Sequence, residues 1–158
     1  MKGPEHDEED LLRAIASCGA RVLMIGRRAL VMLGAPVLTG DYDLWVHFDD
    51  IEALNAALEA LGLFATKSPD EARATGRYVF ENDVRVDVMV ARSAATADGE
   101  RLDFESAWER RQTVDIGAGI ILALPSIDDL ITTKRWGSRP KDVIDIQWLE
   151  MTRRTSRE

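Results

Sequence analysis

A strict alternation of apolar and polar side chains over residues 84–90 constrains the fold of this chain more than any other feature of its sequence. Every second position is a valine, at Val84, Val86, Val88 and Val90. Successive side chains of a strand point to opposite faces of a sheet, so the valines share one face while Arg85, Asp87 and Met89 share the other. The surrounding stretch RYVFENDVRVDVMV therefore predicts a β-hairpin that turns near Asn82-Asp83 and buries its valine face.

The stretch DYDLWVHF at residues 41–48 alternates in the same way. Its apolar face is formed by Tyr42, Leu44, Val46 and Phe48. Its other face is formed by Asp41, Asp43, Trp45 and His47. We expect a strand that buries the first row in the core and leaves its aspartates on the reverse, with His47 at the surface near the strand end.

If these strands are neighbours, three carboxylates converge on one small patch: Asp41, Asp43 and Asp87. They would repel one another unless a cation neutralised them. Mg²⁺, or Mn²⁺ in its place, suits oxygen ligands, and two such ions can clamp the attacking and leaving oxygens of a phosphoryl transfer. Simple solvent exposure also explains Asp41 and Asp43 by themselves, but it does not require a third aspartate on a second strand.

Helical and strand signals alternate along the rest of the chain. Residues 49–62 form the clearest helix, with Asp49 or Asp50 as its cap. Other helices are predicted at 8–17, 27–33, 103–110, 126–136 and 140–149, and other strands at 21–25, 113–117 and 119–124. Residues 92–101 are typical of a mobile surface loop, and residues 67–76 of a loop or a single helical turn.

This order predicts an α+β (mixed α/β) fold in which a mixed β-sheet is flanked by helices. We expect one domain over residues 1–158, with residues 1–8 as a frayed tail and residues 126–152 as C-terminal helices. No apolar run approaches the ~20 residues of a membrane span. The acidic N-terminus differs from a signal peptide, so no membrane partner and a cytoplasmic location are expected.

Composition limits the partners and metals that the chain could bind. The net charge of −8 argues against an extended nucleic-acid surface, which needs a basic face. Residues 126–158 nevertheless carry +1, from seven Lys or Arg against six Asp or Glu, which suits a nucleotide better than a long polymer. One cysteine and two histidines exclude an internal disulfide and make a zinc site improbable, so any metal would need carboxylate ligands.

The segment MIGRRALVMLGAPVLTGDYDLWV resembles the opening of the nucleotidyltransferase-fold superfamily, the DNA polymerase β-like fold. In that family a strand ends in Gly-Gly or Gly-Ser, a short helix follows, and the next strand carries Asp-x-Asp. The matching positions are Gly26, Ala29, Thr39, Asp41 and Asp43, with Asp87 as the third carboxylate. The segment DDLITTKRWGSRPKDVIDIQWLE is similar to the C-terminal helices of small bacterial members related to abortive-infection and toxin–antitoxin nucleotidyltransferases, with matches at Lys134 and Lys141-Asp142.

The resemblance, which covers roughly residues 20–150, implies transfer of a nucleoside monophosphate from an NTP such as ATP to an acceptor hydroxyl. It implies that Asp41 and Asp43 hold two Mg²⁺ ions and that Asp87 completes the site and acts as the base. Backbone N–H groups after Gly26 would cradle the triphosphate at a helix N-terminus, beside Thr39, and Lys134 would add positive charge. The acceptor would be a protein, a tRNA end or a small molecule such as an aminoglycoside, and an oligomer is compatible with this pattern.

Two features leave alternatives open. Arg27 stands where the family has a second small residue, and Arg27 and Arg28 could contact phosphates or lie on the helix surface. Lys134 could equally serve the C-terminal dipole of its helix. The tryptophans are expected in the core, although Trp45 could border the nucleotide. The alternative function is a catalytically inactive nucleotidyltransferase-fold protein that acts as a binding or antitoxin-like module.

Overall fold

The computed structural model describes residues 8–137 and 139–156. Its helices are α1 (Glu8–Ser17), α2 (Gly26–Met32), α3 (Ile51–Glu59), α4 (Pro69–Thr75), α5 (Phe104–Glu109), α6 (Ile127–Lys134) and α7 (Pro140–Ser156). Its strands are β1 (Val22–Ile25), β2 (Tyr42–Val46), β3 (Arg77–Glu81), β4 (Arg85–Met89), β5 (Ser93–Ala95), β6 (Arg101–Asp103), β7 (Gln112–Asp115) and β8 (Ile121–Leu124). The tail expected at residues 1–8 falls outside the described residues except for Glu8, which begins α1.

A mixed four-stranded sheet with the order β1-β2-β4-β3 forms the centre of the fold, which confirms the α+β prediction. The predicted hairpin is the antiparallel pair β3 and β4. Strand β2 runs antiparallel to β1 and parallel to β4. Two small antiparallel sheets, β5-β6 and β7-β8, accompany it.

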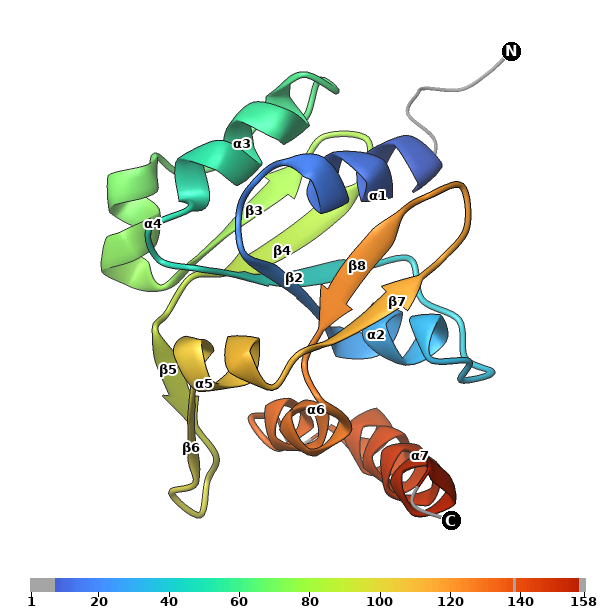
Figure 1. Cartoon of the computed structure of the whole chain (residues 1–158). Coiled ribbons are helices and arrows are strands. Elements are labelled where there is room, and N and C mark those ends of the chain that lie inside the picture. Colours follow the sequence, from blue (N-terminus) through green and yellow to red (C-terminus); the bar gives the residue numbers. More distant parts are fainter. Residues whose placement is uncertain (1–7, 138, 157–158) are drawn as a thin grey trace.

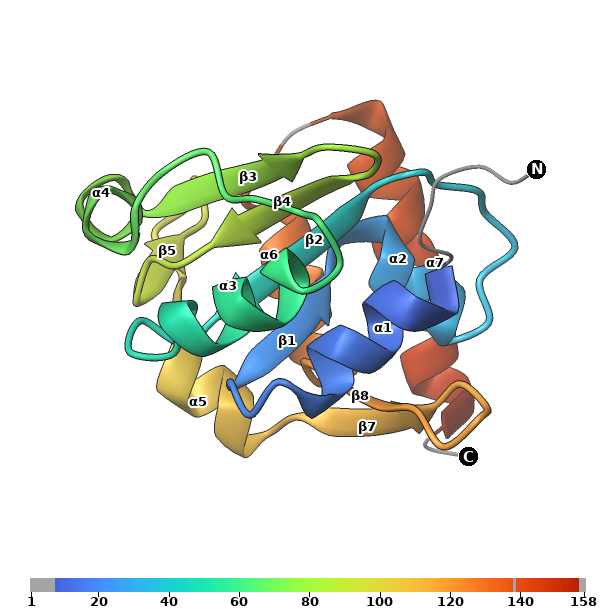
Figure 2. The same ribbon diagram turned by 90° about the horizontal axis from the view of Figure 1, so that it is seen from above.

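Helices lie on both sides of this sheet. Figures 1 and 2 show α1 and α3 against one face, and α5, α6 and α7 on the opposite side. The valine row of β4 and the apolar row of β2 are buried in the larger core, together with side chains from α1 and α3. None of the described helices combines the length and the apolar character needed to cross a bilayer.

The reverse face of the sheet is only half open, because α5 covers part of it. Trp45 is fully buried there against Leu23 and Phe104, and its Nε1–H donates to the carbonyl oxygen of Ala91 at 2.8 Å. The expectation that Trp45 could border a nucleotide is therefore wrong, because its ring is packed against Leu23 of β1 and Phe104 of α5.

The expectation that His47 lies at the surface is wrong for the same reason. His47 is buried, and its ring packs edge-on against Phe104. Its Nδ1 accepts from the backbone N–H of Asp49 at 3.0 Å, so the proton is on Nε2, which lies 2.5 Å from the Glu105 carboxylate.

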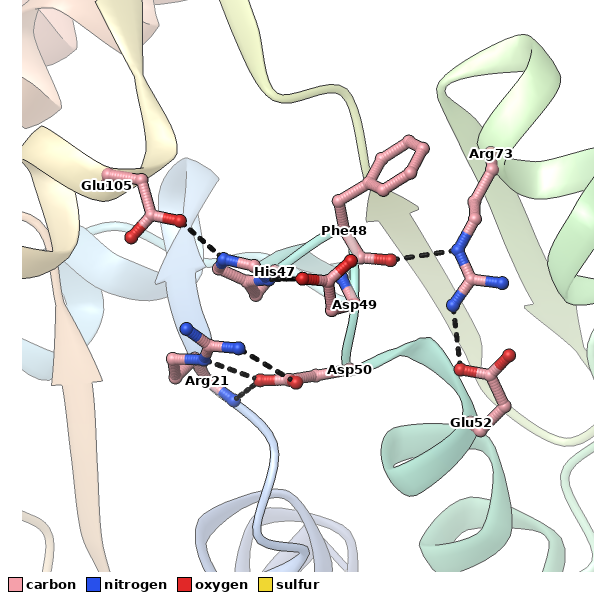
Figure 3. A network of polar contacts seen from close by, with 8 residues as sticks. All are labelled: Arg21, His47, Phe48, Asp49, Asp50, Glu52, Arg73 and Glu105. Carbon is pink, nitrogen blue, oxygen red and sulfur yellow. Dashed lines mark hydrogen bonds and ion pairs between the residues drawn. The ribbon is translucent and has the colours of Figure 1, made fainter.

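The turn from β2 into α3 is held by a polar network, shown in Figure 3. Asp50 is the N-cap residue of α3, as predicted, but its side chain makes no capping hydrogen bond. It accepts instead from the backbone N–H and the guanidinium of Arg21, at 2.8, 2.8 and 3.1 Å. These bonds hold the pKa of Asp50 below its usual value.

Two segments are more ordered than the sequence suggested. Residues 92–101 were expected to be a loop, but β5 and β6 pair within and beside this stretch. The buried Thr96 closes their turn, because its Oγ1 accepts the N–H of Glu100 at 3.0 Å. The stretch 67–76 contains α4, which begins with a full capping box between Ser68 and Glu71.

Candidate active site

The parallel pairing of β2 with β4 brings two of the three predicted aspartates side by side. Asp43 and Asp87 are direct partners in the register, between the pairs Tyr42–Val86 and Leu44–Val88. The partner pairs point into the core, so both carboxylates extend from the opposite face. Asp41 lies immediately before β2 and is exposed. The sheet therefore places Asp43 beside Asp87, with Asp41 immediately before the same strand segment.

Gly26, the first residue of α2, lies directly against Asp43. Its φ of +69° is in the left-handed region, and a Cβ at this position would come within 2.4 Å of Asp43 Oδ2. A glycine is thus required here for two independent reasons. The absence of a side chain lets the Asp43 carboxylate pack directly against the backbone of Gly26.

The three carboxylates influence one another electrostatically. Burial raises the pKa of Asp43 above its usual value, and the charges of Asp87 and Asp41 raise it further. Asp87 is held by a fork from Arg85, whose Nε and Nη2 donate to its two oxygens at 3.2 and 3.1 Å. The backbone N–H of Asp41 donates to Thr39 Oγ1 at 3.2 Å.

These aspartates line one wall of a cleft of about 680 Å³ between the sheet and the turn that joins α6 to α7. Thr39, Gly26, Arg27 and Lys134 also line it. The cleft lining also includes Ala94 and Ala95 of β5, and Arg77 of β3. Most of the residues predicted from the sequence to form a nucleotide site therefore line one cavity.

Lys134 lies at the centre of a buried ion-pair network on the helical wall. It is 6% exposed, and its Nζ is 2.8 Å from Asp145 and 3.7 Å from Asp142. Arg27 donates through Nε and Nη2 to the two oxygens of Asp145 at 3.2 and 3.1 Å. Burial raises the pKa of Asp145, but the hydrogen bonds from Arg27 and Lys134 outweigh it, so the pKa is below its usual value.

The sequence left open whether Arg27 contacts phosphates or lies on the helix surface. Arg27 does line the cleft, but its guanidinium is already paired with Asp145 of α7. Arg28 lies outside the cleft lining. Its guanidinium donates to Glu8 at 2.7 Å and to the carbonyl of Thr39 at 3.1 Å, and it stacks over the ring of Tyr42. Arg28 therefore joins α1 to α2 in this structure and is not directed at the cavity.

The sequence interpretation missed Asp145, Arg77 and the cleft-lining position of Trp136. The spacing of Asp142 and Asp145 was a usable signal, because residues three apart lie on one face of a helix. Nothing local in the sequence distinguishes Arg77 from any other exposed strand residue.

The residue types around Asp43 fit a divalent cation. Carboxylate oxygens are the ligands that Mg²⁺ and Mn²⁺ prefer, and the mutual repulsion at Asp43 is the kind that a cation relieves. Within residues 8–137 and 139–156, no three His, Cys, Asp or Glu side chains are already arranged as a metal cage. The guanidinium of Arg85 contributes to this absence, because it binds both carboxylate oxygens of Asp87, which a metal would need as ligands.

No protein-family model matches the chain, and no curated protein sequence matches it. Solved structures are similar in fold. A candidate nucleotidyltransferase from Thermotoga maritima matches with a TM-score of 0.60 at 12% identity, over 94% of this chain and 89% of that one. The solution structure of the antibiotic-resistance factor ANT(2'')-Ia matches with a TM-score of 0.62 at 17% identity, over 91% and 80%. The crystal structure of ANT(2'')-Ia with adenylyl-2''-tobramycin matches with a TM-score of 0.53 at 18% identity, over 91% and 85%.

Proposed function

Since this chain has the nucleotidyltransferase fold, we propose that it transfers a nucleoside monophosphate from a nucleoside triphosphate to an acceptor hydroxyl. The observation that carries the proposal is the register pairing of Asp43 with Asp87 in the cleft lining, with Gly26 packed against Asp43. A strand that merely exposes its polar side chains to solvent requires neither this pairing nor a glycine packed against one of the two carboxylates.

Each step of the proposed reaction has a candidate group. The acceptor oxygen attacks the α-phosphorus, a new oxygen–phosphorus bond forms, and the bond to the leaving pyrophosphate breaks. The hydroxyl proton passes to the carboxylate of Asp87, which must first leave the fork of Arg85. Asp41, Asp43 and Asp87 would hold Mg²⁺, or Mn²⁺ in its place, which would neutralise phosphate charge and lower the pKa of the acceptor hydroxyl.

The triphosphate is proposed to lie along the side of the cleft formed by Gly26, Thr39 and Lys134. Backbone N–H groups after Gly26, at the start of α2, are proposed to donate to phosphate oxygens. Lys134 and Arg27 contribute positive charge from the cleft wall, although Asp145 neutralises part of it.

The direct test incubates the full chain with each of four α-labelled NTPs and Mg²⁺, with tobramycin or cell extract as acceptor. Tobramycin is included because ANT(2'')-Ia has been seen with its adenylylated form. We expect transfer that the Asp43→Asn variant reduces about 100-fold or more, because a metal-stabilised transition state is worth several kcal/mol. The matched control is Asp70→Asn, whose side chain is 99% exposed and outside the cleft lining.

Absence of transfer from all four nucleotides, together with absence of any Mg²⁺-dependent thermal stabilisation by them, contradicts the proposed activity. Equal transfer by the wild type and Asp43→Asn would show that the reaction centre lies elsewhere.

A second candidate, a catalytically silent binding or antitoxin-like module, is favoured by the fork of Arg85 on Asp87. It predicts that nucleotides stabilise the protein equally with and without Mg²⁺, and that no label is transferred. Under this candidate Asp43→Asn leaves the nucleotide-dependent thermal shift unchanged.

A further inference from the structure

Each acidic side chain known to line the cleft either belongs to the proposed reaction centre or is paired with basic side chains. Among the described residues that line it, the carboxylates are Asp41, Asp43, Asp87 and Asp142. The first three form the proposed reaction centre. Asp142 is buried and lies between Lys134, at 3.7 Å, and Arg139, whose Nε is at 3.3 Å. No cleft carboxylate is left to bind an ammonium group on a substrate.

The positive side chains of the cleft are not all paired. Arg27 and Lys134 bind Asp145, and Arg139 binds Asp142. The two others that line the cleft, Arg77 and Lys141, are exposed, and within the described part of the chain neither has a carboxylate at ion-pair distance. The cavity therefore presents two uncompensated cations and no uncompensated anion outside the reaction centre.

The two cations come from different elements, β3 and α7. Lys141 is in the first turn of α7, on the helical side of the cleft with Lys134, where the triphosphate is proposed to bind. Arg77 is on β3, opposite Met89 of β4, whereas Val79 is opposite Asp87. Arg77 thus lies two residues, about 7 Å, along the strand from the row that holds Asp87.

The other side chains that line the cleft around Arg77 are uncharged and, apart from Met89, small. Thr75, Gly76, Met89, Ala91, Ala94 and Ala95 line the cleft here. Lys67 lies behind this wall, where its Nζ donates to Thr75 Oγ1 at 2.9 Å and to the carbonyl of Arg77 at 3.1 Å. A second cation therefore reinforces the positive potential at this end.

We propose that the acceptor carries a negatively charged group, a phosphate or a carboxylate, and that Arg77 binds this group while the acceptor hydroxyl faces Asp87. The proposal rests on the nucleotidyltransferase activity proposed above and specifies its acceptor class. An arginine fork matches both oxyanions in geometry. A polycationic aminoglycoside would instead place its ammonium groups against Arg77, with no carboxylate to receive them, so this chain and ANT(2'')-Ia differ in acceptor class.

Binding is tested with three compounds that share one carbon skeleton: glycerol, glycerate and glycerol 3-phosphate. Tobramycin supplies the polycation. Titrations use the full chain with Mg²⁺ and a non-hydrolysable ATP analogue, and are repeated without nucleotide. We expect both anions to bind about tenfold or more tighter than glycerol, and tobramycin to bind more weakly than either anion, because hydrogen bonds to charged groups are stronger than those between neutral groups.

Three variants assign the binding to a residue. Arg77→Gln is expected to abolish the preference for the anions, whereas Lys141→Gln retains it in the nucleotide-free titration. Arg13→Gln removes the same charge from α1, outside the cleft lining, and should change nothing. A preference that survives in Arg77→Gln, or that is lost in Lys141→Gln alone, overturns the assignment to Arg77.

Transfer of label to the same four compounds separates this inference from the activity on which it rests. Transfer to tobramycin that exceeds transfer to glycerol 3-phosphate, and is lost in Asp43→Asn, overturns the acceptor class and leaves the activity standing. Anion binding that depends on Arg77, without transfer to any compound, supports the anion site and counts against the activity.

Discussion

At the scale of single residues, the contact between Gly26 and Asp43 is the most demanding feature of the site. A side chain at Gly26 would need a left-handed backbone and would collide with the Asp43 carboxylate. Gly34 provides a matched comparison, because its φ is +102° but nothing lies within 4 Å of its missing Cβ. Comparing substitutions at these two glycines therefore separates the cost of backbone strain from the cost of the collision with Asp43.

We predict that Gly26→Ala lowers the free energy of unfolding more than Gly34→Ala. Left-handed backbone costs a non-glycine residue about 1–2 kcal/mol at either position. The collision at Gly26 adds about 1–3 kcal/mol, as overpacking generally does. Urea unfolding of both variants measures the difference, and equal losses would show that Asp43 moves aside freely.

At the scale of elements, the joint between β2 and α3 depends on Asp50 and Arg21 (Figure 3). The pKa of Asp50 is lowered, first of all by its hydrogen bond with the Arg21 side chain. A lowered pKa in the folded state stabilises the protein above the unfolded pKa, near 4 for aspartate, and this stabilisation is lost as the pH falls through the folded pKa. Because Arg21 is 39% exposed, solvent screens part of the interaction.

We predict that Asp50→Asn destabilises the protein by about 1 kcal/mol at pH 7, as a screened charge-assisted pair would. The difference between wild type and variant should shrink steadily below pH 4. Chemical denaturation at pH 7, 4 and 2.5 measures it. A difference that stays constant with pH would assign the effect to helix geometry and not to charge.

At the scale of the whole molecule, Asp145 ties α7 to α2 and α6 on the helical side of the cleft. It is 1% exposed and binds Arg27 of α2 and Lys134 of α6 from its place on α7. The position of this wall relative to the three aspartates therefore depends on one buried carboxylate.

We predict that Asp145→Asn destabilises the protein by about 3–5 kcal/mol, because removing one partner leaves two positive charges in the wall without compensation. Thermal and urea unfolding measure the loss, with Asp70→Asn as the exposed control. A loss below 1 kcal/mol would mean that Asp142 or water neutralises Arg27 and Lys134 in place of Asp145.

Local patterns were sufficient to predict most elements and the strand faces. Alternation assigns Asp43 and Asp87 to the faces opposite the apolar row of β2 and the valine row of β4, whatever the strands' neighbours are. Caps and glycines end the helices, so α1, α3 and α5 lie close to their predicted ranges. The reason is that these signals act over a few residues, within which the chain has little freedom.

The pairings between distant segments were decided by the tertiary structure alone. Whether β2 lies beside β4, which brings Asp43 to Asp87, depends on how whole faces pack. The burial of Trp45 and His47 follows from α5, and the pairing of Lys134 with Asp145 follows from the crossing of α6 and α7. Short sequence patterns predict which face a side chain takes, but only the packed fold supplies the partner across that face, because the partner is many residues away in the chain.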